Sequence, residues 1–135
     1  MKKILMILLA TILCSCGKRI TCGKFQYIYV LNNESNHTLM IESEPFYPSF
    51  PNKITLTPGE SFSRTSRYSA VAIPSNLLRI TFDGKYTIDQ SSFAKHRNPR
   101  DIKNYIINEG KWHVTLTYTF TNEDYEIAKQ QKKNP

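Results

Sequence analysis

The chain is short of the residues from which catalytic and metal sites are built. Its 135 residues include three cysteines, three histidines and five glycines. His37, His96 and His113 lie far apart in sequence and form no pair at the spacing that metal sites on helices use. The sequence also has no glycine-rich phosphate loop and no serine in a nucleophile elbow. We therefore expect no bound metal, no cofactor and no enzyme activity.

No apolar run is long enough to cross a membrane as a helix. The main one covers residues 4–13, about 10 residues, whereas a spanning helix needs roughly 20. It follows Lys2 and Lys3, and a basic start before such a run is typical of a secretory signal peptide. The alternative, a short buried helix, does not explain the basic start or the small residues that follow.

The apolar run ends in Leu13-Cys14-Ser15-Cys16, which resembles the lipobox of bacterial lipoproteins. A signal peptidase needs a small side chain before the cut, so Ser15 favours cleavage before Cys16 over cleavage before Cys14. The resemblance implies a thioether-linked lipid on Cys16 and acylation of its new amino group, and two or more chains hold a protein firmly to a membrane. We therefore predict a signal peptide, a lipidated tether and one domain, at 1–15, 16–24 and 25–135.

Cleavage leaves Cys22 as the one cysteine without lipid, so no internal disulfide can form. It is either an unpaired thiol or half of an intermolecular disulfide. The formal charge of +7 falls to about +5 once the signal peptide is removed. No RNP, zinc-finger or helix-turn-helix pattern points to nucleic acid, and Lys18, Arg19 and Lys24 beside the lipid favour an anionic membrane surface.

From residue 25 onward the pattern predicts β-strands. The clearest covers residues 112–121, WHVTLTYTFT, in which apolar and polar side chains alternate strictly and so occupy opposite faces. About seven short strands, with turns every 8 to 12 residues or so, favour an antiparallel sandwich or barrel. Residues 122–133 begin acidic and end basic, which predicts a short terminal helix. The apolar side chains predicted to share the core face of the clearest strand are Trp112, Val114, Leu116, Tyr118 and Phe120.

Residues 77–88, LLRITFDGKYTI, predict a hairpin whose register follows from its apolar residues. A two-residue loop at Asp83-Gly84 would separate Ile80 from Tyr86 on opposite faces. A three-residue loop at 82–84, with Gly84 left-handed and Thr81 opposite Lys85, puts the apolar residues together. The residues then expected on one face are Leu78, Ile80, Tyr86 and Ile88.

The segment EPFYPSFPNK places three aromatic residues, Phe46, Tyr47 and Phe50, among three prolines. Prolines at this density exclude a central strand, so the segment is a loop or a blunted sheet edge. Two interpretations remain open. The rings form an exposed platform that contacts a glycan or peptide, or they cover the end of the core, which a small domain needs.

The lipobox followed by NNESNHT, ITLTPGESF, ITFDGKYTI and YTFTNEDYEIA resembles a group of small lipoproteins of unknown function from Bacteroides-type gut bacteria. The resemblance covers most of the mature chain and implies an immunoglobulin-like β-sandwich anchored by lipid, but no catalytic or binding residues. Surface-exposed lipoproteins of those bacteria tend to carry acidic residues after the anchor. The basic GKRIT here favours the periplasmic side of the outer membrane.

These observations together predict a non-catalytic accessory or binding lipoprotein of the cell envelope. Its expected partners are the membrane, through Cys16, and an envelope protein or a glycan. Two alternatives remain: a structural or assembly lipoprotein of the pilus-like kind, and a dedicated glycan-binding module.

Overall fold

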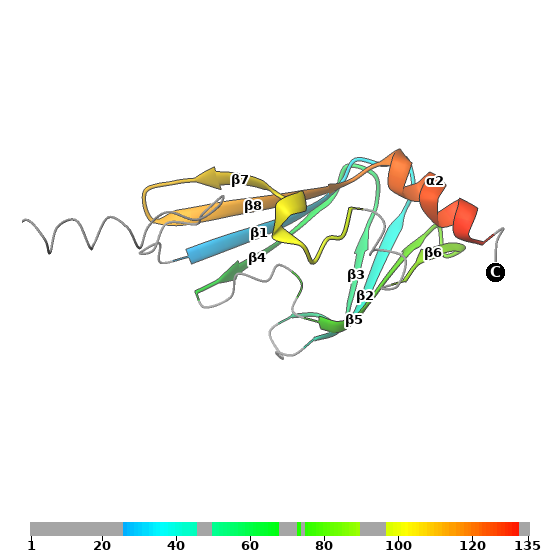
Figure 1. Cartoon of the computed structure of the whole chain (residues 1–135), viewed down its shortest axis with the longest axis horizontal. Coiled ribbons are helices and arrows are strands. Elements are labelled where there is room, and N and C mark those ends of the chain that lie inside the picture. Colours follow the sequence, from blue (N-terminus) through cyan, green and yellow to red (C-terminus); the bar gives the residue numbers. More distant parts are fainter. Residues whose placement is uncertain (1–25, 46–49, 68–72, 74, 90–96, 133–135) are drawn as a thin grey trace, which may run out of the picture.

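The computed structural model describes residues 26–45, 50–67, 73, 75–89 and 97–132. The predicted signal peptide and tether lie outside these residues. The described chain forms eight strands in two four-stranded sheets, with one short α-helix after the last strand (Figure 1). The elements are β1 (Gln26–Asn33), β2 (Leu39–Pro45), β3 (Lys53–Leu56), β4 (Ser61–Ser66), β5 (Ser75–Phe82), β6 (Tyr86–Ile88), the 3₁₀ helix η2 (Ile102–Asn104), β7 (Ile106–Glu109), β8 (His113–Phe120) and α2 (Asn122–Gln131).

The first sheet has the strand order β4-β1-β8-β7, and the second has the order β3-β2-β5-β6. The chain changes sheet after β1, β3, β4 and β6, whereas β2–β3, β5–β6 and β7–β8 are pairs within one sheet. This two-layer arrangement confirms the predicted mainly-β sandwich with a terminal helix, although the strands number eight instead of about seven.

β1 and β8 run parallel, which corrects the expectation of a wholly antiparallel fold. Their register extends from Gln26 opposite His113 to Asn33 opposite Phe120. All the other pairs described are antiparallel. A period of two reports which face of a strand is buried but not the direction of its neighbour, and β1 and β8 are too far apart in sequence for a hairpin to set that direction.

β8 carries the centre of the core, as the alternating pattern predicts. Val114 and Leu116 have no exposed surface, and Tyr118 and Phe120 are each 1% exposed. Trp112 was expected on the same face, but it precedes the strand and is 58% exposed. The reason is that the chain turns from β7 into β8 at this residue, since Glu109 pairs with Val114.

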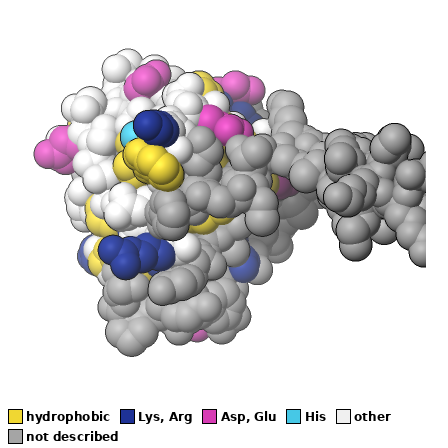
Figure 2. All heavy atoms as spheres, turned by 90° about the vertical axis from the view of Figure 1, so that its left-hand side faces the viewer, with side chains coloured by type: hydrophobic (Ala, Val, Ile, Leu, Met, Phe, Trp, Pro, Cys, Tyr) yellow, Lys and Arg dark blue, Asp and Glu magenta, His cyan; other side chains and the backbone are white. Residues whose placement is uncertain are grey.

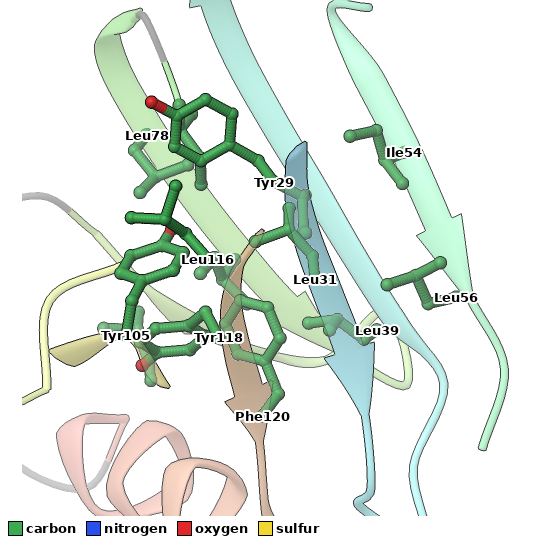
Figure 3. Close-up of a cluster of buried hydrophobic side chains, with 14 of the residues drawn as sticks. Tyr29, Leu31, Leu39, Ile54, Leu56, Leu78, Tyr105, Leu116, Tyr118 and Phe120 are labelled. Carbon is green, nitrogen blue, oxygen red and sulfur yellow. The ribbon is translucent and has the colours of Figure 1, made fainter. Parts of the chain in front are cut away.

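Side chains from both sheets meet between the layers (Figure 3). Leu39 and Ile41 of β2 are almost completely buried, as are Ile54 and Leu56 of β3. Each buried aliphatic or aromatic side chain of this size contributes about 1.5–3 kcal/mol relative to exposure. The labelled members of the cluster are Tyr29, Leu31, Leu39, Ile54, Leu56, Leu78, Tyr105, Leu116, Tyr118 and Phe120.

The β5–β6 hairpin confirms the predicted shared face and corrects the predicted register. Phe82 pairs with Tyr86 and Thr81 with Thr87, so the three-residue loop is 83–85 instead of 82–84. The shift places Phe82 in the core with no exposed surface, instead of in the loop. Asp83 and Gly84 both have positive φ, 52° and 63°, which suits the Asp-Gly pair.

α2 packs against the second sheet beside β6 and begins with a side-chain cap (Figure 1). The backbone N–H of Thr121 donates to Oδ2 of Asp124 at 2.8 Å. The Tyr125 ring makes edge contacts with the rings of Phe82 and Tyr86, at centroid distances of 5.9 and 5.5 Å. Among the described residues, no helix is long and apolar enough to cross a membrane.

We predict that Gly84→Val lowers the free energy of unfolding by about 1 kcal/mol or more, because a Cβ is disfavoured at positive φ. No atom lies within 4 Å of the position that this Cβ would take, so the loss reports backbone strain and not a clash. Urea unfolding measures it. Gly84→Asn is the matched control and should lose less, because asparagine tolerates this conformation. Equal losses in the two variants would contradict the interpretation.

Candidate functional site

Of the four site residues predicted from the sequence, only Phe50 lies in the part of the chain that the structure describes. Cys16, Phe46 and Tyr47 lie outside the described residues. Phe50 is described, and it is only 2% exposed. Phe50 therefore does not belong to an exposed aromatic platform. Its ring lies in the core, as the second interpretation of this segment predicts for it.

The surroundings of Phe50 explain its burial. Its ring meets the Phe62 ring edge-on at a centroid distance of 6.0 Å, and the Arg64 guanidinium carbon lies 5.5 Å from its centroid. Phe62 and Arg64 come from the inner face of β4, an edge strand of the first sheet. Phe50 thus closes the space between the sheets beside that edge.

A second cluster, which we call the distal cluster, consists of His37, Asp83 and Tyr125. Nδ1 of His37 lies 2.7 Å from Oδ2 of Asp83, and the His37 ring stacks on the Tyr125 ring at 3.5 Å and 7°. Asp83 also accepts from the backbone N–H of Thr38 at 3.0 Å through Oδ1. The cluster therefore joins the β1–β2 loop, the β5–β6 hairpin and helix α2.

The loop that carries His37 is shaped by the buried amide of Asn33. Its Nδ2 donates to the carbonyl oxygens of His37 and Leu56, at 2.8 and 2.9 Å. Its Oδ1 accepts from the backbone N–H and the hydroxyl of Ser35, at 3.1 and 2.6 Å. All the hydrogen-bonding positions of this side chain are used, which lets it lie in the core with no exposed surface.

A histidine held by an aspartate is a component of some catalytic sites, but here the nearby hydroxyl is committed elsewhere. Oγ of Ser35 is buried and bonded to Asn33. The contacts that the structure gives the distal cluster link the β1–β2 loop, the β5–β6 hairpin and α2. Sequence reasoning missed it because His37 and Asp83 are 46 residues apart, and their shared signal was only that both follow strands in turn-forming segments.

An ion pair with a buried carboxylate lies where β8 passes into α2. Nη2 of Arg97 is 3.5 Å from Oδ2 of Asp124, and the guanidinium lies over the Tyr118 ring at 5.2 Å. Burial raises the pKa of Asp124, although the Thr121 backbone N–H and Arg97 both act to lower it. Burial likewise raises the pKa of Tyr118 to about 12. Arg97 thus compensates the carboxylate charge only in part.

The outer face of the first sheet carries no charged side chain over three successive rows of the described strands. Hydroxyl and amide side chains lie there beside β-branched apolar side chains, and Ile106 is 65% exposed. Charged groups are depleted at the centres of protein interfaces, so these rows suit contact with another protein. The rows, in register order, are Thr65, Ile28, Thr115 and Asn108; Ser63, Val30, Thr117 and Ile106; and Ser61, Asn32 and Thr119.

The part of the chain that the structure describes contains no group of three histidine, cysteine, aspartate or glutamate residues placed to hold a metal ion. His113 is exposed, and His96 lies outside the described residues. Comparisons with protein-family models, curated proteins and solved structures gave no match for the chain.

We predict a pH dependence of stability that Asp124→Asn removes. The folded-state pKa of Asp124 is above its ordinary value of 3.8. At a pH between these two values, the folded chain keeps a proton on this carboxyl group that the unfolded chain has lost. The stability that wild type gains from this proton is complete below the ordinary value and is lost as pH rises through the folded-state pKa.

The amide introduced by Asp124→Asn keeps an oxygen acceptor for Thr121 but does not titrate, so the difference in unfolding free energy between the two proteins isolates Asp124. Urea unfolding of both between about pH 3 and about pH 6.5 measures it. Wild type should lose stability relative to Asp124→Asn as pH rises. If the difference in unfolding free energy stays constant with pH, or grows in favour of wild type, burial is not the main influence on the pKa of Asp124.

Proposed function

We propose that the protein is a lipid-anchored, non-catalytic binding protein of the bacterial cell envelope, related to the Bacteroides-type lipoproteins that its sequence resembles. The observation that carries the proposal is LCSC at the end of a signal-like apolar run, with Cys16 as the lipidated residue. The first described strand begins at Gln26, soon after this cysteine. A short tether before a folded domain is the arrangement expected of such a protein.

The binding role is supported by the uncharged outer rows of the first sheet. Ile106 lies at the edge strand β7, and Val30 and Thr117 lie beside it in the same row. The three rows contain no aromatic side chain of the kind expected to contact a glycan, and their composition fits the uncharged centre of a protein interface. Among the partners expected from sequence, we therefore favour an envelope protein.

Two finer assignments belong to the same proposal. The two packed sheets, joined by connections that change sheet repeatedly, support an immunoglobulin-like sandwich. The basic Lys18 and Arg19 after the anchor support the periplasmic side of the outer membrane over surface display.

We predict that Cys16→Ser abolishes lipidation and leaves an uncleaved precursor, because lipid attachment to this thiol precedes the cut. Metabolic labelling with radioactive palmitate, followed by gel mobility of the labelled protein, measures both steps. Cys14→Ser is the matched control and should be labelled and cleaved like wild type, since Cys14 is discarded with the signal. Normal labelling of the Cys16 variant would contradict the assignment.

We also predict that the double variant Ile106→Lys/Thr117→Lys loses the partner contact. Two ammonium groups in the middle row would have to be desolvated on binding. Chemical cross-linking in intact native cells, read as the yield of the cross-linked adduct, measures the contact. Thr55→Lys, exposed on β3 of the second sheet, is the matched control and should keep the adduct. An adduct unaffected by the double variant would place the contact elsewhere.

A further inference from the structure

We propose that the turn between β7 and β8, Lys111–Trp112, docks into the membrane surface beside the lipid anchor and thereby orients the domain on the bilayer. This inference rests on the proposed lipidation of Cys16. It adds a second contact, made by the folded domain itself, between the protein and the membrane.

The position of the turn follows from the strand register. Gln26, the first residue of β1, lies opposite His113, the first residue of β8. Because the two strands run parallel, the turn before His113 is at the end of the sandwich where the chain enters from the tether. Figure 1 shows this end at the left, with α2 at the opposite end.

The tether is short enough to keep this end close to the bilayer. Residues 17–25 extend at most about 30 Å at about 3.3 Å per residue. A docked turn requires less than this full extension, so the lipid on Cys16 and the turn can reach the same surface together. The entropy of restricting the domain near the membrane is already lost through the anchor, which makes a weak second contact effective.

The chemistry of the turn suits the headgroup region. Trp112 is 58% exposed, although tryptophan brings a large apolar ring with a single N–H donor. Tryptophan is enriched where membrane meets water for this reason. Lys111 Nζ lies 5.3 Å from the Trp112 ring centroid, so its ammonium group is placed to meet lipid phosphates when the ring enters.

The hairpin is closed on either side of Lys111 and Trp112. The backbone N–H of Gly110 donates to the carbonyl of His113 at 2.8 Å and closes the hairpin. The His113 ring lies so close to Gly110 that a Cβ there would approach its Cε1 to 2.7 Å. Figure 2, which looks onto this end, shows basic, hydrophobic and histidine side chains next to one another in the upper part of the view, with acidic side chains around them.

The indole ring, not net charge, is the main element of the contact. Arg67, exposed at the end of β4 next to β1, adds a positive group at this end, whereas Glu109 adds a negative one. The far end of the sandwich is also basic, but its Tyr86 and Tyr125 rings are partly buried against each other. Among the residues that the structure describes, exposed aromatic surface therefore distinguishes the end that carries Trp112.

The test uses the fact that Trp112 is the one tryptophan in the chain. Mature protein, purified from its native membrane, is reconstituted into phosphatidylethanolamine–phosphatidylglycerol vesicles containing brominated acyl chains. We expect Trp112 emission to shift to the blue, to be strongly quenched by the bromine atoms and to be protected from acrylamide in the water. Mass spectrometry of the N-terminal peptide reports lipidation of Cys16 independently.

The matched control moves the lone tryptophan to the other end, as Trp112→Phe/Asn36→Trp, since Asn36 is exposed in the loop after β1. Its emission should be quenched by acrylamide and several-fold less by the brominated lipid. Lipidated wild type whose Trp112 behaves like this control would overturn the inference and leave the anchor standing. Equal bromine quenching of both positions would also overturn it, and absence of the lipid would overturn both proposals.

Discussion

The buried side-chain amide of Asn33 is the contact on which the arrangement of the two sheets depends. It lies at the last residue of β1 and bonds across to the carbonyl of Leu56 on β3, so it joins the first sheet to the second at 2.9 Å. An unsatisfied buried polar group costs about 1–3 kcal/mol, and here four bonds satisfy this one. The chain therefore changes sheet after β1 with every hydrogen-bonding position of this buried side chain satisfied.

From Asn33 the polar contacts continue outward to the end of the sandwich. The carbonyl of His37 accepts from Asn33, and the His37 side chain contacts Asp83 and Tyr125. The β1–β2 loop, the β5–β6 hairpin and α2 are consequently held as one unit. The opposite end has a different character, with an exposed tryptophan and the start of β1. The two ends of the molecule thus differ in chemistry although the sheets connect them.

Local patterns in the sequence predicted the faces of the strands well. The alternation in β8 identified every second residue from Val114 to Phe120 as core, and the apolar residues of the β5–β6 hairpin identified its buried face. Faces follow from local periodicity, which a single chain displays directly.

Which strands and side chains lie next to each other was not predictable in the same way. The parallel pairing of β1 with β8 and the contact between His37 and Asp83 join segments far apart in sequence, and no local pattern encodes them. Trp112 was placed in the core because it continued the alternation, but the strand begins one residue later. The buried role of Asn33 could not be predicted, since an asparagine in a turn and an asparagine buried with four hydrogen bonds look alike in sequence.

The proposed membrane contact and the proposed binding face are linked by the strand direction. β1 and β8 both run away from the Trp112 end, and the uncharged rows follow at every second residue. At about 3.3 Å per residue, successive rows are about 7 Å apart, so three rows span about 13 Å from first to last. With Trp112 in the headgroups, the face stands out from the bilayer, and its middle row, with Ile106, Val30 and Thr117, lies above the lipid surface. Docking of one turn would then fix both the height and the direction at which a partner meets the sheet.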